Sequence, residues 1–198
     1  VEVPAERFIQ LVVPEYAVHE QKFSDVLGEL SRLYGIRFAV QVVTQGEFRE
    51  PQISVKIRNQ SFKELINQVV AATQVQEAEW SIVGPGPNLV CIVLGRLSVE
   101  DYPLHLQIES WKAPPGLSPG DALSRLFWVV PELRDRFFGG SGVVGSVPPY
   151  VNYGCELVFE AQNSSVRDMI DRISRIANRS WLFAYDASAR RISAWKVF

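Results

Sequence analysis

The chain contains one motif twice, as Asn59-Gln60-Ser61-Phe62-Lys63-Glu64-Leu65-Ile66 and as Asn163-Ser164-Ser165-Val166-Arg167-Asp168-Met169-Ile170. The two copies agree in residue character at every position. In each copy a serine is followed three positions later by an acid, Glu64 after Ser61 and Asp168 after Ser165. The serine hydroxyl can accept from the amide three residues on, and the acid complements the positive end of the helix dipole. Both copies therefore predict the start of a helix.

Apolar residues at helical spacing predict the helices themselves. The first has the stripe Phe23, Val26, Leu27, Leu30, Leu33 and Tyr34, and Gly35 follows it where a left-handed C-cap is favourable. The second runs from Phe62 to Val70, and the fourth has the stripe Val166, Met169, Ile170, Ile173, Ile176 and Ala177. The third begins after Ser118, with Pro119 at its first position and Asp121 as the acid, and Pro131 is expected to end or kink it.

Alternating and β-branched apolar residues predict strands between these helices. They cover residues 36–40, 53–57, 104–108 and 155–159, and two hairpins, 80–83 with 89–94 and 181–185 with 191–197. Each copy of the motif follows an alternating strand and leads to a hairpin that opens with a tryptophan, Trp80 or Trp181. This repeated order predicts an α+β fold of two tandem small modules, each with two helices packed on small mixed or antiparallel sheets.

We place the boundary between the modules in the polar stretch before Tyr102, giving modules at 1–97 and 98–198. The second module differs from the first by the proline-rich Ala113-Pro114-Pro115-Gly116 and by a glycine- and proline-rich insertion at 138–150. A function that belongs to this protein individually is expected where the two copies differ, at residues 111–119 and 138–150.

The composition excludes several classes of protein. The 198 residues include 20 Lys and Arg and 22 Asp and Glu, for a net charge of −2. A general nucleic-acid binder would be strongly basic, so no nucleic-acid partner is expected. No apolar run approaches the roughly 20 residues that a membrane-spanning helix needs, so direct membrane insertion by this segment is not expected either.

The first half resembles the short N-terminal domain shared by secretins and TonB-dependent receptors. The resemblance lies in Phe23-Ser24-Asp25-Val26-Leu27-Gly28-Glu29-Leu30-Ser31-Arg32-Leu33-Tyr34-Gly35-Ile36, which is similar to the helix–glycine–strand segment of that family. Residues 53–57 and 61–66 are similar to its segment of strand, short polar link and capped helix. The likeness covers residues 20–95 and, through the repeated motif, 155–198, whereas the first part of the second half, with its proline-rich stretch and glycine-rich insertion, departs from the pattern.

This resemblance implies a noncatalytic protein-interaction module in the periplasm or cell envelope of a Gram-negative bacterium, with an envelope protein as its partner. The family's contact residues are not a fixed motif, so none is transferred to this chain. Independently, small modules with hairpins leave sheet edges whose unpaired backbone groups can receive a partner strand.

The sequence predicts no catalytic, cofactor-binding or metal-binding residue, and we expect no enzyme. Residues 140–145 match G-x-G-x-x-G, but no helix can open at Val147-Pro148-Pro149 to hold a phosphate. His19 and His105 have no nucleophile and acid in a known order beside them, and His105 is expected to point away from Leu104 and Leu106. Cys91 and Cys155 have no spacing typical of zinc and are expected to be small apolar residues in strands. A disulfide between them would require their two strands to be neighbours, and the sequence leaves that alternative open.

The alternative function is a ligand-binding module for a glycan or a peptide. Trp111, Phe137, Phe138 and Tyr150 surround the two unusual segments of the second half and could form an apolar patch or groove. Trp80, Trp128 and Trp181 are expected to pack in the core instead.

Overall fold

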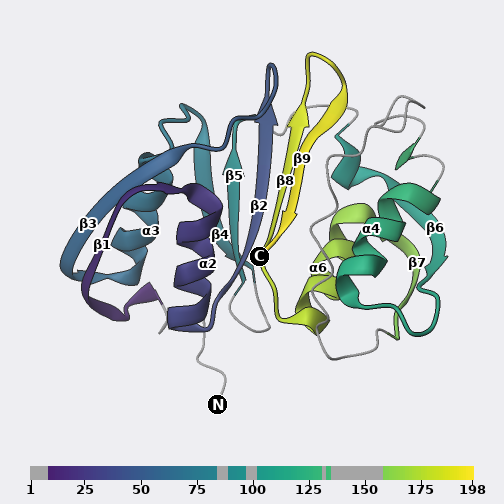
Figure 1. The fold of residues 1–198 in the computed structure, drawn as a ribbon, viewed down its shortest axis with the longest axis horizontal. Coiled ribbons are helices and arrows are strands. Elements are labelled where there is room, and N and C mark those ends of the chain that lie inside the picture. The colour runs from purple at the N-terminus through teal and green to yellow at the C-terminus, as the bar shows by residue number, and fades with distance from the viewer. Residues whose placement is uncertain (1–8, 84–88, 97–101, 131–132, 135–157) are drawn as a thin grey trace. The chain divides into compact units, whose positions relative to one another are not determined.

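The computed structural model describes residues 9–83, 89–96, 102–130, 133–134 and 158–198, and it has the α+β fold that the sequence predicts (Figure 1). Its internal contacts divide the chain into two compact units. The first unit consists of residues 1–42, 49–96 and 198, and the second of residues 43–48 and 97–197. Each unit is described by itself below.

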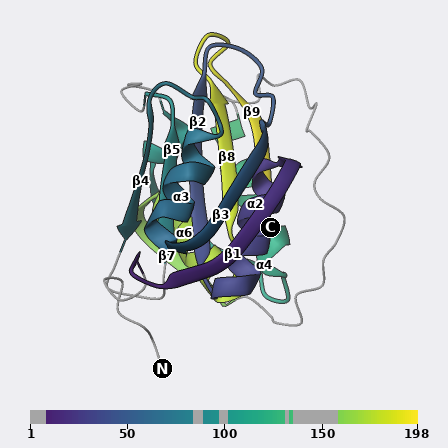
Figure 2. The same ribbon diagram turned by 90° about the vertical axis from the view of Figure 1, so that its left-hand side faces the viewer.

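In the described residues of the first unit, two helices lie between two sheets. Its elements are β1 (Val12–Lys22), α2 (Phe23–Tyr34), β2 (Arg37–Thr44), β3 (Gln52–Ser61), α3 (Phe62–Ala71), β4 (Ala78–Val83) and β5 (Leu89–Leu94). Strands β1 and β3 form an antiparallel pair. In the other sheet β5 lies between β4, its antiparallel partner, and β2, its parallel partner. Figures 1 and 2 show α2 and α3 in the layer between these sheets.

The core of the first unit follows from the predicted apolar stripes. Phe23, Val26, Leu27 and Leu30 of α2 are buried, and Gly35 has the predicted left-handed conformation with φ 64°. Leu33 was predicted in the same stripe, but it is 51% exposed because the last turn of the helix extends past the core. Strand β5 is buried along its whole length, as expected for a strand covered on both faces.

The described part of the second unit also contains helices and antiparallel strand pairs. Its elements are a 3₁₀ turn (Pro103–His105), β6 (Gln107–Lys112), α4 (Pro119–Val129), β7 (Glu160–Ser165), α6 (Val166–Ala177), β8 (Trp181–Asp186) and β9 (Arg191–Val197). Strands β6 and β7 pair antiparallel, and so do β8 and β9. Helices α4 and α6 lie between these two pairs in Figure 1. Within the described residues, no helix is both long and apolar enough to cross a membrane.

The two copies of the motif have the same local conformation. Asn59 and Asn163 both have positive φ, 51° and 45°, and the hydroxyls of Ser61 and Ser165 both accept from the amide three residues on, as predicted. The equivalence extends to the first residue of each helix, because Phe62 N–H donates to Leu11 O at 2.8 Å and Val166 N–H donates to Leu106 O at 3.0 Å. The wider prediction, that modules 1–97 and 98–198 are tandem copies of one family, stays a prediction.

Two strand predictions need correction, and one strand was not predicted. The strand predicted at 104–108 is wrong over its first residues, because Pro103–His105 form a 3₁₀ turn closed by the His105 N–H to Tyr102 O bond at 3.0 Å. Strand β1 was not predicted at all, because Pro14 and an irregular register between Val18 and Gln21 interrupt its alternation. Of the strand predicted at 155–159, residues 155–157 lie outside the described residues, and β7 begins after Phe159.

The serine cap at the start of α3 gives a testable expectation for stability. Replacing Ser61 with alanine removes the acceptor for the Glu64 amide at 3.2 Å, so we expect a loss of about 1 kcal/mol in the free energy of unfolding. Ser110 is exposed on β6, so Ser110→Ala is the matched control and should change stability by less than about 0.5 kcal/mol. Chemical denaturation measures both variants, and equal effects would contradict the capping role of Ser61.

Candidate functional site

The aromatic site predicted in the second half is only partly described. Trp111 lies on β6, is 9% exposed, and packs its ring against Phe159 at 5.8 Å between centroids. The guanidinium of Arg172 lies over the Phe159 ring, 4.7 Å from its centroid. Trp111 is therefore a packed side chain of the second unit. Phe137, Phe138 and Tyr150 lie outside the described residues, so the proposed patch stays a prediction.

The tryptophans expected in the core differ in burial. Trp181 is buried as expected, and its indole N–H donates to Asp171 Oδ1 at 2.8 Å. Trp80 was expected in the core, but it is only half-buried on β4, with its indole N–H donating to Asn67 Oδ1 at 2.8 Å. The side chain of Trp128 lies outside the part of the chain that the structure describes.

Of the residues considered for cofactor and nucleophile chemistry, some lie outside the described residues and the others are described. The glycine motif at 140–145 and Cys155 lie outside the described residues. Cys91 is buried on β5 as expected, and its Sγ accepts from Gln41 Nε2 at 3.5 Å. His105 is exposed in the 3₁₀ turn rather than on a strand, with its ring edge-on to Tyr102.

His19 lies beside a serine hydroxyl. Its Nδ1 lies 3.2 Å from Ser54 Oγ, which also accepts from the Glu20 N–H at 2.9 Å. Glu20 has a φ of 49°, and the register of β1 against β3 shifts between Val18 and Gln21. The hydroxyl thus bridges an irregular part of an exposed strand pair. These contacts account for the Ser–His proximity without a nucleophilic role.

Burial and, for two of them, a neighbouring carboxylate explain the pKa shifts of three tyrosines. Burial, and then the neighbouring carboxylate of Glu29, raises the pKa of Tyr16, whose hydroxyl donates to Glu29 Oε2 at 3.2 Å. Burial also raises the pKa of Tyr34 and, together with the charge of Asp186, that of Tyr185. Among the described residues, no three His, Cys, Asp or Glu side chains come together in a way that could hold a metal ion.

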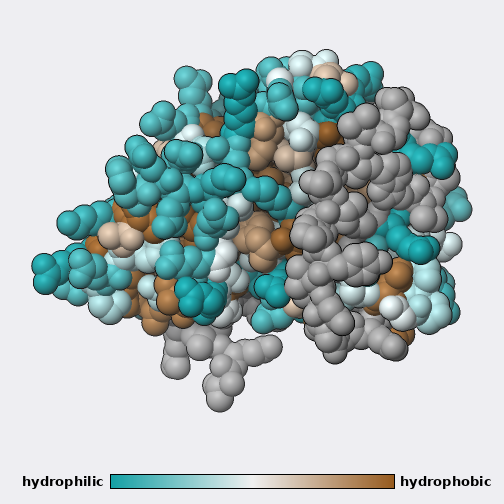
Figure 3. All heavy atoms as spheres, viewed as in Figure 1, coloured by the Kyte–Doolittle hydropathy of each residue, from teal (hydrophilic) through white to brown (hydrophobic). Residues whose placement is uncertain are grey.

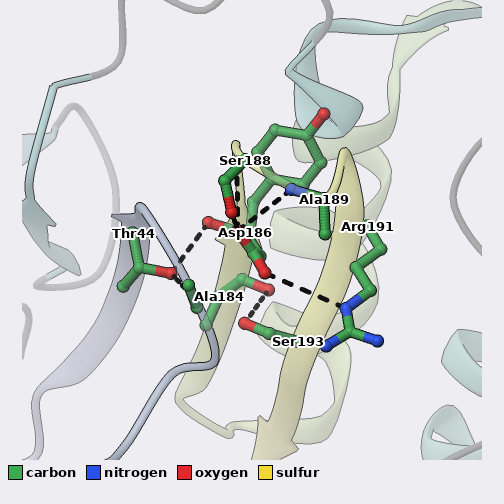
Figure 4. A network of polar contacts seen from close by, with 9 residues as sticks. Thr44, Ala184, Asp186, Ser188, Ala189, Arg191 and Ser193 are labelled. Carbon is green, nitrogen blue, oxygen red and sulfur yellow. Dashed lines mark hydrogen bonds and ion pairs between the residues drawn. The ribbon is translucent and has the colours of Figure 1, made fainter.

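Asp186 organises the turn between β8 and β9 (Figure 4). Its buried Oδ1 accepts from the hydroxyl of Ser188 at 2.6 Å, from the Ser188 N–H at 3.0 Å and from the Ala189 N–H at 3.2 Å, and Arg191 lies 3.9 Å from its other oxygen. The hydrogen bond from the Ser188 side chain is the main reason why the pKa of Asp186 lies below its ordinary value. At the same turn, the Ala187 N–H donates to Thr44 O at 2.9 Å. The carboxylate therefore fixes the hairpin.

The lowered pKa of Asp186 gives a pH dependence with a definite sign. A depressed pKa in the folded state contributes stability above the unfolded value of about 3.9, and this contribution is lost as the pH falls further through the folded value. We therefore expect Asp186→Asn to lower the melting temperature at neutral pH. The difference from the unmodified chain should shrink as the pH falls below about 4.

Thermal unfolding between neutral pH and pH 3 checks this expectation. Glu47→Gln is the matched control because it removes an exposed carboxylate from the loop after β2. A difference between Asp186→Asn and the unmodified chain that stays constant across the acidic range would contradict the role assigned to the carboxylate.

Strand β4 has one backbone edge that no described strand covers. It stands at the end of its sheet, so among the described strands only β5 pairs with it. The Gly95 N–H donates to Glu77 O at 2.7 Å, so the backbone N–H and C=O groups of Glu77 point toward β5. Because the direction of these groups alternates along an antiparallel pair, the backbone groups of Glu79, Ser81 and Val83 also point toward β5. The N–H and C=O groups of Ala78, Trp80 and Ile82 point the other way.

The side chains of β4 also alternate. Ala78, Trp80 and Ile82 are half-buried, whereas Glu79, Ser81 and Val83 are exposed. The Trp80 indole bonds to Asn67 on α3, so the half-buried row faces that helix. The strand therefore presents a half-buried apolar row on one face and an exposed row, with Glu79 and Ser81 before the apolar Val83, on the other.

Sequence reasoning missed two of these features. Strand β4 was predicted as the first strand of a hairpin, but its position at the end of a sheet depends on pairing between β2 and β5, which are distant in sequence. The Asp186 network had a local signal, because Asp followed two positions later by Ser is typical of a turn closed by the carboxylate.

Comparison with known proteins gives no further assignment. No protein-family model matches the chain, and neither a curated protein nor a solved structure is significantly similar to it.

Proposed function

We propose that this protein is a noncatalytic protein–protein interaction module of the Gram-negative cell envelope, acting in the periplasm with a secretin or a TonB-dependent system. The observation that carries the proposal is the open edge of β4, whose outward N–H and C=O groups can pair with a strand of another protein. Such pairing needs no catalytic group and no cofactor.

The assignment to the envelope rests on the resemblance to the short N-terminal domain of secretins and TonB-dependent receptors. The segments that carry it have the secondary structure that it implies. Residues 23–36 form a helix, a glycine with positive φ and the approach to a strand, and residues 52–71 form a strand, a serine cap and a helix. This agreement supports the proposal at the level of local structure.

Affinity capture tests the proposed function. The immobilised chain, offered a Gram-negative envelope extract, should retain a specific protein that a heat-unfolded sample does not retain. A parallel glycan array tests the alternative function. Recovery of no specific protein together with clear glycan binding would overturn the interaction proposal.

A further inference from the structure

We propose that the edge of β4 binds an extended segment of a partner protein in which apolar residues alternate with polar ones and a lysine or arginine faces Glu79. This inference rests on the proposed function and deepens it, because it names the docking strand and the chemistry of the partner.

Strands β1 and β3, the other strands of the first unit with a free edge among the described residues, are protected against edge pairing. Proteins block exposed edges with proline, with charged residues and with local irregularity. Strand β1 contains Pro14, Lys22 and the positive φ of Glu20, and β3 contains Lys56 and Arg58. Hydrophilic side chains cover much of the face of this unit seen in Figure 3.

The strands of the second unit carry similar protection. Strand β6 ends in Lys112, β7 contains Asn163 with positive φ, and β9 contains Arg191 and Lys196. Strand β4 has no proline, no lysine or arginine and no residue with positive φ, and its one charged residue is Glu79. Among the described strands at sheet edges, it is therefore the one whose protection is limited to a single carboxylate (Figure 2).

The backbone of β4 determines how a partner would pair. The outward N–H and C=O groups belong to Ala78, Trp80 and Ile82, so a partner strand would exchange hydrogen bonds with these residues. The ladder between β4 and β5 uses the other residues of β4 and remains intact. Binding therefore requires no rearrangement of the sheet.

The side chains of β4 determine what sequence a partner would have. On one face Trp80 and Ile82 are half-buried and leave apolar area beside the edge, and the bond from Trp80 to Asn67 fixes the indole. Alternate apolar residues of the partner would cover this area. On the other face Glu79 is exposed, and Glu77 is exposed just before the strand, so a basic side chain is complementary there.

The same charges argue against a second copy of this chain as the occupant. Two β4 edges brought together would bring Glu77 and Glu79 of both copies to one interface without a lysine or arginine on either strand. Like charges near one another on paired strands are destabilising. A partner of different, basic sequence avoids this cost.

Peptide binding tests the proposal with the full chain. The probe is a fluorescently labelled hexapeptide of alternating valine and lysine, compared with a valine–glutamate peptide and with a valine–lysine peptide whose edge-facing amides are N-methylated. We expect the valine–lysine peptide to bind about fivefold or more tightly than the valine–glutamate peptide, which corresponds to about 1 kcal/mol. N-methylation should abolish binding, because it removes the donors to the edge.

Two variants place the interaction on β4. Glu79→Lys should reverse the preference between the two peptides, whereas Glu47→Lys, the same charge change in an exposed loop, should leave it unchanged. Ile82→Pro removes an outward N–H without removing a bond to β5, so it should abolish binding of the valine–lysine peptide while circular dichroism and the melting temperature stay close to those of the unmodified chain.

Four results would overturn the inference. The first is equal affinity for the three peptides, and the second is an unchanged peptide preference in Glu79→Lys. The third is a dimer of this chain that dissociates in Ile82→Pro, which would make a second copy the occupant. A captured envelope protein that binds Ile82→Pro and Glu79→Lys undiminished would overturn the placement on β4 and leave the proposed function standing. Failure of the unmodified chain to capture any protein, together with clear glycan binding, would instead overturn the proposed function.

Discussion

Replacing Phe183 with alanine is expected to destabilise the second unit by about 3–5 kcal/mol. Phe183 lies on β8, is 0% exposed, and is at the centre of an aromatic cluster. Its ring centroid lies 5.9 Å from that of Tyr102, 6.0 Å from that of Phe127 and 6.3 Å from that of Trp195. The truncation removes these contacts and leaves a cavity that the packed rings cannot close.

Chemical denaturation followed by circular dichroism measures this effect. Val158→Ala is the control, because Val158 is 93% exposed and its truncation should change the free energy of unfolding by less than about 0.5 kcal/mol. A loss below about 1 kcal/mol for Phe183→Ala would contradict the central position assigned to this ring.

The second large effect is expected in the first unit, where Phe62→Ala should also cost about 3–5 kcal/mol. Phe62 is the first residue of α3 and is 1% exposed. Its ring meets Tyr34 edge-on at 5.2 Å, and its N–H donates to Leu11 O at 2.8 Å. The side chain thus joins α3 to the end of α2 beside the start of β1.

Leu33→Ala is the matched control for Phe62→Ala. Leu33 lies next to Tyr34 on α2 but is exposed, so its truncation should cost less than about 1 kcal/mol. Hydrogen exchange in both variants locates the loss. Similar destabilisation by the two substitutions would contradict the burial pattern on which the core of the first unit rests.

The helices could be predicted from the sequence because their signals are local. Ser61, Ser118 and Ser165 each accept from the amide three residues on, so the start of each of these helices is specified within four residues. The apolar stripes located the buried faces correctly except at their ends. Leu33 and Ile176 fit the spacing but are exposed, because a helix can continue beyond the core that it covers.

The strands were harder to predict because their signals depend on partners elsewhere in the chain. Strand β1 lost its alternation at Pro14 and at the irregular register after Val18, although it pairs with β3 along most of its length. Leu104 and Leu106 flank His105 as in a strand, but Leu104 is buried from a 3₁₀ turn instead. Period-two spacing over so few residues does not separate the two conformations.

The candidate site could be predicted only in part for the same reason. The sequence indicated that hairpin edges could receive a partner strand, and the hairpin of β4 and β5 was placed correctly. Which strand ends the sheet depends on the parallel pairing of β2 with β5, which no local pattern reveals. Trp80 was expected in the core but is half-buried, because one side of β4 has no neighbouring strand in the described part of the chain.

Amide hydrogen exchange along β4 tests the central claim, an open edge that receives a partner strand, most directly. In the free protein, Glu79 and Ser81 should be protected by their bonds to β5, whereas Trp80 and Ile82 should exchange rapidly. Adding the valine–lysine peptide should protect Trp80 and Ile82 and leave Glu79 and Ser81 unchanged. Protection of Trp80 and Ile82 already in the free protein, or their rapid exchange with the peptide bound, would contradict the claim.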